Sequence, residues 1–197
     1  MARNVFISFR FSDGHEYKDD LSKRFDQDED TVDYSEDEDR SDMSDETIRK
    51  YLYKKLKRSS VTIVLLTPRA LNHKKNKFGK YDDWMYDEIR YSLENRENNR
   101  PNGLIAVYTP EAAGKLIEPR PNGTIKVKNV DNLFRKNIMN VKGTYKWHRE
   151  PGVFDEDYDS YCSLVSYERF IENIGWYIDT ASLKRDDIQK YDIVKRL

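Results

Sequence analysis

The chain has 197 residues, of which 36% are charged and 37% hydrophobic, and its formal net charge is −1. This length suits a single domain, and an aromatic content of 13% can build a core where aliphatic side chains are scarce, which argues against a disordered chain. The lone cysteine, Cys162, excludes an internal disulfide and is typical of a reducing compartment. No segment approaches the ~20 apolar residues of a membrane span, and the start MARNVFISF lacks the apolar stretch of a signal peptide, so we expect a cytoplasmic protein without membrane contacts.

Charge is distributed unevenly along the chain. Residues 26–46 hold twelve Asp or Glu and one basic residue, Arg40, whereas residues 47–80 hold eleven Lys or Arg and no acid. The plainer interpretation is a solvated acidic loop followed by basic faces. The alternative is that the acidic loop docks on a basic patch of the same chain or of a partner subunit. A basic patch alone would suggest nucleic acid, but the adjacent acidic run makes that unlikely.

A short apolar run near the N-terminus predicts the first strand. Val5–Phe9 reads VFISF, and residues 12–14 form a polar turn after it. Residues 16–25 carry apolar side chains spaced four apart, which predicts a short helix. The acidic residues 26–46 predict a long loop, in which residues 32–35 are a candidate second strand.

A helix and a strongly predicted strand follow. Ser44 or Asp45 can cap the helix, whose apolar stripe ends at Leu56. Residues 61–66 form a continuous, β-branched apolar run, which predicts a central parallel strand covered on both faces. Pro68 stops this strand.

The middle of the chain predicts one more helix and one more strand. Residues 72–80 form a basic loop, after which Asp82 or Asp83 caps a helix that runs to about residue 95. Residues 104–108 form another buried apolar run.

The remainder is harder to interpret. Residues 111–160 are rich in loop signals, with a small edge strand expected at 124–130, and Ser166 can cap a last helix. The side chains expected to face inward from that helix are Phe170, Ile171, Ile174, Tyr177 and Ile178.

Strands and helices alternate, which predicts an α/β fold with an open parallel sheet and helices on both faces. Ligands of such sheets bind beyond the carboxyl ends of the strands. The residues that we expect at this edge are Ser8, Phe9, Arg10, Phe11, Thr67, Tyr108 and Thr109.

The common phosphate-binding motifs are absent from the sequence. There is no G-x-x-x-x-G-K-[ST] and no G-x-G-x-x-G, and the first strand ends in FRFSDG, which has no glycine cradle. The three histidines, His15, His73 and His148, are scattered, so we expect them to be solvated rather than to ligate a metal.

The most informative pair is Trp84 and Glu88. They stand four residues apart on a predicted helix, so they are neighbours on one face. Glu88 lies at the margin of an apolar stripe, where desolvation disfavours a charged carboxylate. From spacing alone, a surface glutamate beside a core tryptophan is the plainer interpretation.

Four segments in order resemble TIR and TIR-like domains. VFISF at 5–9 followed by Asp13 resembles the opening strand, SSVTIVLLT at 59–67 the central strand, Trp84-x-x-x-Glu88-Ile89 the helix with the catalytic glutamate, and GLIAVY at 103–108 the next strand. The chain is most similar to the bacterial TIR-like family represented by the ThsB protein of Thoeris anti-phage systems. The resemblance covers residues 4 to about 110.

The resemblance implies a flavodoxin-like sheet and cleavage of NAD at its nicotinamide–ribose bond. The product would be an ADP-ribose-derived signal nucleotide that activates a separate effector in anti-phage defence. NAD would be the substrate, and neither a cofactor nor a metal would be required. Carried onto this chain, Glu88 is the catalytic carboxylate. The residues expected to contact the nucleotide are Ser8, Phe9, Arg10, Asp13 and Trp84.

We expect one TIR-like domain over residues 1–197, with a core at about 4–110 and 166–181. The acidic insertion 26–46 replaces the family's second strand and following loop, and we expect it to be mobile or dependent on a partner because its acids repel one another. Residues 111–165 have no counterpart in the family and could form a lid, an oligomer contact or a second-substrate pocket.

Other functions stay open at this point. A scaffold module would use Glu88 structurally, paired with a neighbour such as Arg90 or with a basic loop residue. It would act through assembly, including a homo-oligomer. A nucleotide- or nucleic-acid-binding protein of similar fold is the third alternative. Asp13 and Asp83 are weaker candidates for catalysis, because a turn or a helix cap already explains each of them.

Overall fold

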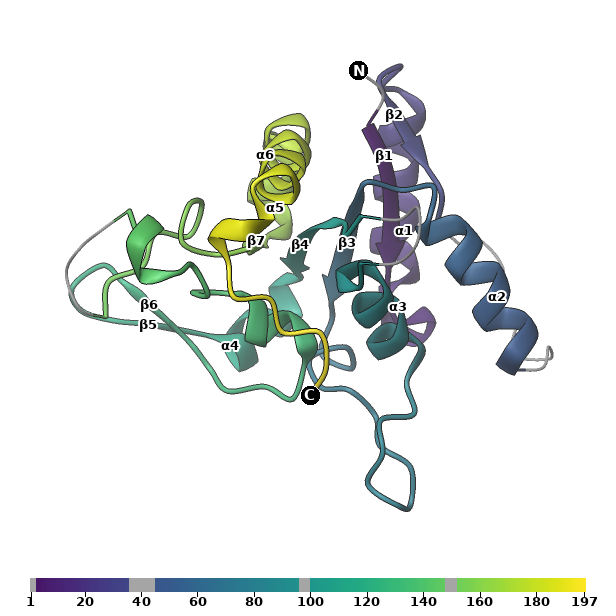
Figure 1. Cartoon of the computed structure of the whole chain (residues 1–197), viewed down its shortest axis with the longest axis horizontal. Coiled ribbons are helices and arrows are strands. Elements are labelled where there is room, and N and C mark those ends of the chain that lie inside the picture. The colour runs from purple at the N-terminus through teal and green to yellow at the C-terminus, as the bar shows by residue number, and fades with distance from the viewer. Residues whose placement is uncertain (1–2, 36–44, 96–99, 148–151) are drawn as a thin grey trace.

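The computed structural model describes residues 3–35, 45–95, 100–147 and 152–197. Within these residues lies a five-stranded, fully parallel sheet in the order β2-β1-β3-β4-β7, with helices on both faces (Figure 1). Its strands are β1 (Arg3–Ser8), β2 (Thr31–Asp33), β3 (Val61–Leu66), β4 (Gly103–Tyr108) and β7 (Cys162–Ser166). The helices are α1 (Phe11–Asp26), α2 (Asp45–Leu56), α3 (Trp84–Leu93), α4 (Pro110–Leu116), α5 (Tyr167–Glu172) and α6 (Ile174–Asp186). This is the α/β, flavodoxin-like architecture that the sequence predicts.

The three central strands confirm the expected parallel core. Ser8 of β1 pairs with Val64 of β3, and Leu66 of β3 pairs with Tyr108 of β4. Every residue of β3 is buried, as a continuous apolar run requires in a sheet covered on both faces. The carboxyl ends of these strands therefore lie along one edge, where ligands of parallel sheets bind.

The alternation of side chains along β1 decides what each face of the sheet contacts. Val5 and Ile7 pack with residues of α1 and α6, whereas Phe6 packs with α2 and with Tyr91 of α3. Ser8 continues the second set, so its hydroxyl points to the face that α3 covers. A single-residue change of register would turn this hydroxyl away from α3.

The first helix begins earlier than expected. α1 starts at Phe11 rather than at residue 16, and Asp13 and Gly14 form its first turn instead of a loop. An acid is favourable there because the N-terminus of a helix carries a partial positive charge. β2, at Thr31–Asp33, begins one residue earlier and ends two residues earlier than the expected strand at 32–35. Because it pairs with β1, the acidic segment contains a second strand rather than replacing it, which corrects that expectation.

The largest correction concerns the region after residue 110. The fifth strand, β7, has all but its last residue in the segment 111–165 that the sequence left unassigned, and it pairs with β4 from Leu104↔Cys162 to Tyr108↔Ser166. The expected edge strand at 124–130 is instead β6 (Ile125–Val127), which pairs only with β5 (Ile117–Pro119) in a separate antiparallel ribbon.

The predicted last helix is divided into α5 and α6. Ser166 caps the first part by accepting a hydrogen bond from the backbone N–H of Arg169 at 3.3 Å. The chain bends at Asn173, whose backbone angles of φ −141° and ψ 41° are not helical. The inward stripe is retained across the bend, since Phe170, Tyr177 and Ile178 are buried.

The expected mobility of the acidic insertion stays a prediction. Residues 36–44, including the candidate cap Ser44, lie outside the described residues. In the described part, Asp28 forms an ion pair with Arg3 at 3.3 Å, and Asp33 accepts a hydrogen bond from Ser22 at 2.7 Å. No helix among the described residues has the length and apolar character that crossing a membrane demands.

We predict that Gly103→Ala destabilises the protein by about 1–3 kcal/mol, because a Cβ at this position would collide with the backbone carbonyl of Ala181 in α6. Gly114→Ala is the matched control. A Cβ added at this position of α4 would meet no heavy atom of the described residues within 4 Å, apart from its chain neighbours and its own helix backbone. Because alanine favours a helix more than glycine does, Gly114→Ala should raise the free energy of unfolding by about 0.5–1 kcal/mol. Urea denaturation of both variants measures the difference, and equal effects would contradict the close strand–helix packing.

Candidate functional site

Glu88 lies in the second turn of α3 and points at the end of β1. Its Oε2 accepts a hydrogen bond from the Ser8 hydroxyl at 2.5 Å, and the residue is only 9% exposed. None of the described cations forms an ion pair with it. Arg90, the partner expected for a structural role, pairs instead with Asp87 and Glu94, each at 3.2 Å. Glu88 is thus a buried carboxyl group held by one neutral donor.

This environment shifts the titration of the group. Burial raises the pKa of Glu88 to about 8, because a desolvated carboxylate is costly. The hydrogen bond from Ser8 and the charge of Arg10 act in the opposite direction, while the negative charges of Asp83 and Asp87 add to the rise. A strongly shifted carboxyl group at the ligand-binding edge of a sheet is characteristic of a functional site.

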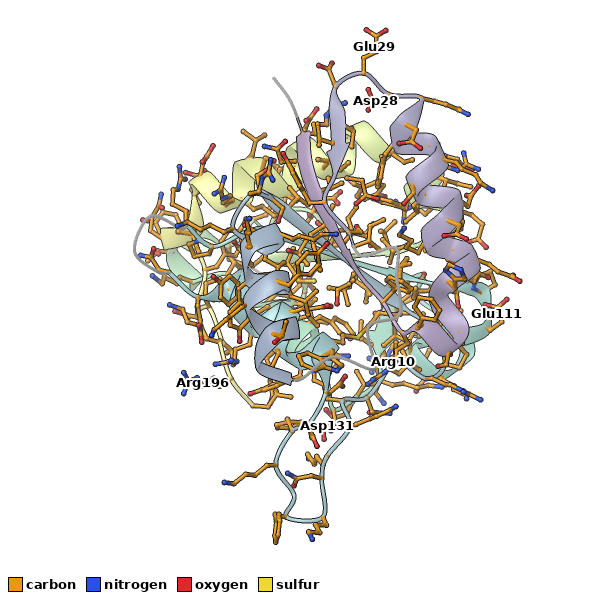
Figure 2. All side chains as sticks on the ribbon, turned by 90° about the vertical axis from the view of Figure 1, so that its right-hand side faces the viewer. Arg10, Asp28, Glu29, Glu111, Asp131 and Arg196 are labelled. Atoms are coloured by element: carbon orange, nitrogen blue, oxygen red, sulfur yellow. The ribbon has the colours of Figure 1, made fainter. Side chains whose placement is uncertain are left out.

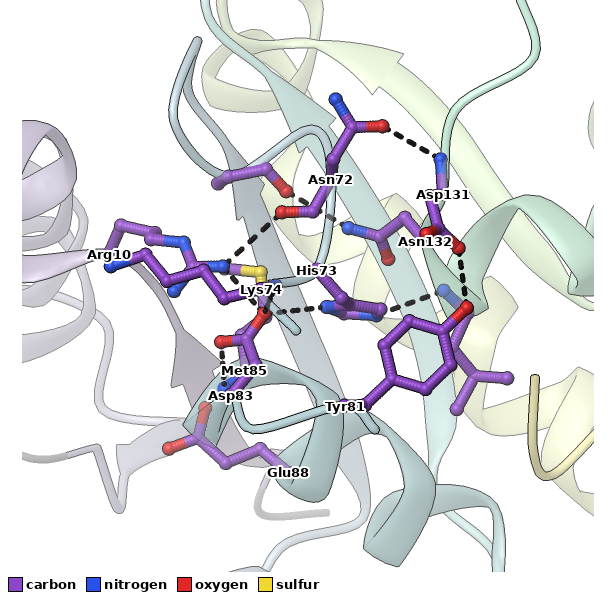
Figure 3. A network of polar contacts seen from close by, with 12 residues as sticks. Arg10, Asn72, His73, Lys74, Tyr81, Asp83, Met85, Glu88, Asp131 and Asn132 are labelled. Carbon is purple, nitrogen blue, oxygen red and sulfur yellow. Dashed lines mark hydrogen bonds and ion pairs between the residues drawn. The ribbon is translucent and has the colours of Figure 1, made fainter. Parts of the chain in front are cut away.

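Asp83 is the centre of a polar network beside Glu88 (Figure 3). Its Oδ2 receives the Arg10 guanidinium at 2.5 Å, His73 Nδ1 at 3.0 Å and the backbone N–H of Lys74 at 3.0 Å. Its Oδ1 accepts from the backbone N–H of Met85 at 3.3 Å and so caps α3. Although burial alone would raise the pKa of Asp83, the hydrogen bond from His73 and the charge of Arg10 hold it below its usual value.

His73 corrects an expectation from the sequence. It is buried at 5% exposure rather than solvated, and its Nε2 accepts a hydrogen bond from the backbone N–H of Leu133 at 3.0 Å. Because Nε2 accepts, Nδ1 is the nitrogen that donates a hydrogen bond to Asp83, so the two contacts fix the orientation of the ring. His15 is exposed as expected, 3.5 Å from Asp19, and His148 lies outside the described residues.

The network extends into the region beyond residue 110. The backbone N–H of His73 donates to the carbonyl of Asp131 at 2.7 Å, and Asn132 Nδ2 donates to the carbonyl of Ala70 at 2.9 Å. Tyr81 donates its hydroxyl proton to Asp131 at 2.6 Å (Figure 3). Residues 131–133 therefore support the loop between β3 and α3.

The Arg10 guanidinium is held by acceptors from the loop between β3 and α3 and from the start of α3. Besides Asp83, its guanidinium donates to the carbonyls of Arg69 at 3.1 Å and Asn72 at 3.3 Å. These three acceptors engage the side chain, which is only 10% exposed. Figure 2 places Arg10 at the lower end of the body, where β1 passes into α1.

Asp13 and Thr67 provide polar atoms with open hydrogen-bonding capacity at the same edge. Asp13 Oδ2 accepts from the backbone N–H of Arg69 at 2.9 Å, but its Oδ1 is buried and has no partner among the described residues. Thr67 Oγ1, just past β3, is also buried and has no hydrogen-bond partner among the described residues. Unsatisfied buried polar atoms are uncommon in proteins, so two of them at this edge favour a polar ligand.

The two aromatic candidates flank this edge differently. Phe9 is half-buried, with its ring centroid 5.9 Å from that of Phe11. Trp84 is also half-buried but packs against the cluster formed by Phe6, Leu52, Leu56 and Tyr91, toward α2. The structure therefore pairs Ser8 with Glu88 and holds Arg10 in the neighbouring Asp83 network, whose charge acts on Glu88. Asp13 lies at the same edge, and Trp84 packs toward α2.

The sequence did not identify Asp83 as the centre of this network, or His73 and residues 131–133 as parts of it. The helix-cap signal at Asp83 was visible, but the convergence of Arg10 and of the loop residues His73 and Lys74 on one carboxylate depends on tertiary contacts. Among the described residues, no group of three or more His, Cys, Asp or Glu side chains could hold a metal ion.

Comparison with models of known protein families places the chain in a family. The family model described as Thoeris protein ThsB, TIR-like domain, matches residues 6–114, which is more than half of the chain. This range contains Ser8, Arg10, Asp13, Asp83 and Glu88, and it ends before β5. No curated protein matches the sequence significantly.

We predict that Glu88→Gln changes how stability varies with pH. The folded-state pKa of about 8 lies above the ordinary value of 4.5, so the folded wild type keeps a proton that the unfolded chain loses between these values. Wild-type stability should therefore fall as the pH rises from about 4.5 to 8. The free energy of unfolding of the variant should not fall in this way. Above pH ~8 it should be higher than that of the wild type by about 2–5 kcal/mol. Urea denaturation across this range measures the effect, and parallel profiles would contradict it.

Proposed function

Since the chain belongs to the TIR-like family of the Thoeris protein ThsB, a family of anti-phage defence, we propose that it cleaves the nicotinamide–ribose bond of NAD. The observation that carries the proposal is the Glu88 carboxyl group, buried at the carboxyl edge of the parallel sheet and held by Ser8 at 2.5 Å. We assign Glu88 as the catalytic residue.

A carboxylate suits this reaction because positive charge develops on the ribose. As the bond from C1′ to the nicotinamide nitrogen breaks, its electron pair passes to the nitrogen, and the ribose becomes oxocarbenium-like. A fixed negative charge in a site that excludes water stabilises that state far more than it would in bulk water. Nicotinamide leaves as a neutral molecule, so the step requires no general acid. A water molecule or a hydroxyl of the substrate itself then attacks C1′ and loses a proton.

The neighbouring residues support this chemistry by position. Ser8 orients the carboxylate, and Arg10 and Asp83 fix the end of β1 against the start of α3. Asp13 Oδ1 and Thr67 Oγ1 have capacity for hydroxyl groups of a ribose, and the half-buried ring of Phe9 offers a surface for a base. Trp84 contributes indirectly, through the packing of α3 against α2.

The remaining parts of the proposal concern the cellular context. The product would be a diffusible nucleotide derived from ADP-ribose that acts on a separate effector in the cytoplasm. No cofactor or metal ion takes part in the mechanism written above.

The scaffold alternative is less well supported. It requires a structural partner for Glu88, and Arg90 is engaged by Asp87 and Glu94 instead. A carboxyl group with a pKa of about 8 and no ion pair among the described residues costs stability rather than adding to it. Such a cost is expected where a residue serves catalysis.

We predict that Glu88→Gln lowers the rate of nicotinamide release from NAD by about 10²–10³-fold, because glutamine keeps the shape but loses the charge. Asp87→Asn is the matched control on the same helix, since its carboxylate faces Arg90, and it should stay within a few-fold of the wild type. Release is followed by chromatography under conditions where the wild type is active. A well-folded Glu88→Gln protein with full turnover would remove the assignment.

We also predict a pH dependence of kcat/KM for NAD. Because the reaction needs ionised Glu88 and burial raises its pKa to about 8, kcat/KM should rise with pH and level off above that value. Ser8→Ala removes a hydrogen bond that lowers this pKa, so the rise should shift to higher pH. A rate that instead falls as the pH rises would indicate that protonated Glu88 acts as an acid.

A further inference from the structure

The loop between β3 and α3 contains a projecting element that the proposed reaction does not use. Residues 74–81, which we call the basic hairpin, extend beyond the body of the molecule in both views (Figures 1 and 2). Lys75 and Tyr81 form an antiparallel bridge at its base. The segment carries four lysines and no acid, and Phe78 at its tip is 75% exposed. No other large hydrophobic residue in the described part of the chain is as exposed.

The tip of the basic hairpin is held in one conformation. Asn76 Oδ1 accepts hydrogen bonds from the backbone N–H groups of Phe78 at 2.9 Å and Lys80 at 3.1 Å. The backbone N–H of Gly79 donates to the carbonyl of Asn76 at 2.9 Å, and Gly79 supplies the positive φ of 72° that this tight turn requires. A large apolar side chain on a fixed turn loses little entropy when it binds, which is the property of an anchor residue.

A cavity lies on another side of the molecule. It has a volume of about 530 Å³ and opens beyond the carboxyl ends of β4 and β7, against the β5–β6 ribbon. Its apolar lining includes Ile125, Val127, Ile138, Met139, Phe154 and Leu164. Three of these, Ile125, Met139 and Phe154, are at least 37% exposed at the mouth, together with Val153.

The wall formed by residues 152–160 is acidic. This segment carries four acids and no lysine or arginine. Asp155 and Glu156 line the cavity, whereas Asp159 is fully buried and accepts hydrogen bonds from the backbone N–H groups of Trp147 and Asp155. Among the described residues, Arg169 is the one lysine or arginine in the lining, and it is paired with Glu156 at 3.2 Å. The mouth therefore combines exposed apolar surface with a net negative lining, which complements the lysines and phenylalanine of the basic hairpin.

These two features cannot meet within one molecule. Figure 1 shows the basic hairpin below α3 on one side and the β5–β6 ribbon on the other, and a separation seen in projection is a lower limit to the true distance. An occupant that carries this hairpin must be a second copy of the chain.

We propose that Phe78 of one molecule inserts into the cavity between β7 and the β5–β6 ribbon of another, with the hairpin lysines facing the acidic segment 152–160. The contact joins different surfaces of the two copies, so it leaves one hairpin and one cavity open at the ends. Association then continues until a ring closes or a filament grows. A contact this small is weak, so the oligomer forms as the protein concentration rises.

Sedimentation velocity of the full chain over a range of concentrations tests the proposal at low and high salt. The wild type should associate, and more strongly at low salt because charged surfaces are screened by ions. Phe78→Ala should weaken association by at least about 30-fold, as truncation of a central aromatic anchor does. Leu183→Ala is the matched control, since Leu183 is 67% exposed on α6 and outside both surfaces, and it should change nothing.

A second experiment uses the fact that the two molecules contribute different surfaces to the contact, the hairpin of one and the cavity of the other. Val153→Arg places a cation at the mouth of the cavity, on an exposed residue that the fold does not require, and should also give monomers. An equimolar mixture of Phe78→Ala and Val153→Arg chains retains one intact hairpin and one intact cavity. It should form heterodimers and nothing larger.

A wild type that stays monomeric at every concentration would overturn the proposal. Association that survives Phe78→Ala, or a mixture of the two variants that stays monomeric, would do the same. A small molecule that copurifies with the protein and is lost in Val153→Arg, with association unaffected, would identify a different occupant of the cavity and also reject the proposal.

Discussion

A carboxylate in the interior of a protein is stable only when donors replace the water it has lost, and Asp83 meets this condition with three donors on one oxygen. The donors come from the end of β1, from His73 and from the backbone of Lys74, and the other oxygen caps α3. Removing any one of them would leave a buried charge partly uncompensated, at a cost of a few kcal/mol. The Asp83 carboxylate thus fixes the end of β1 relative to α3, and that relation determines the distance between Ser8 and Glu88.

The same network raises the free-energy cost of ionising Glu88. Asp83 brings a negative charge close to a second carboxyl group, and Arg10, whose charge offsets it in part, forms its ion pair with Asp83 and donates to two backbone carbonyls rather than to Glu88. Glu88 consequently has one neutral donor and a pKa raised to about 8, first by burial. A purely structural site would not gain from this arrangement, because replacing Glu88 by an uncharged residue would relieve both the desolvation and the repulsion. The cost is understandable where a negative charge is needed only as the substrate becomes positive.

The sequence predicts the sheet well wherever burial leaves a continuous pattern. Val61–Leu66 is apolar at nearly every position because both faces are covered, so its boundaries are correct to the residue. β7 escaped prediction because it has only five residues, CSLVS, with serines at positions that face a helix or end the strand. α1 was shortened because Asp13 and Gly14 resemble a turn, although an acid also suits a first helical turn. Glu88 could be proposed from its spacing to Trp84 and from family resemblance, and the apolar stripe beside it indicated desolvation, whereas its near-complete burial against Ser8 and the nearby charge of Asp83 could not be predicted. That environment comes from contacts between residues up to 80 positions apart, such as Ser8 and Glu88.

The region beyond residue 114, where the family match ends, makes direct hydrogen bonds to the residues that support the site. His73 is held between Asp83 on one side and Leu133 on the other, and its backbone donates to Asp131. The basic hairpin begins at Lys74, whose backbone N–H donates to Asp83, and ends at Tyr81, whose hydroxyl donates to Asp131. Both of its ends are therefore attached to the network that positions α3. A force on the hairpin is therefore transmitted first to Asp83 and its donors. Any partner that engages the hairpin acts within two residues of the carboxylate on which the geometry of Glu88 depends, and the residues after 114 determine how far that carboxylate can shift.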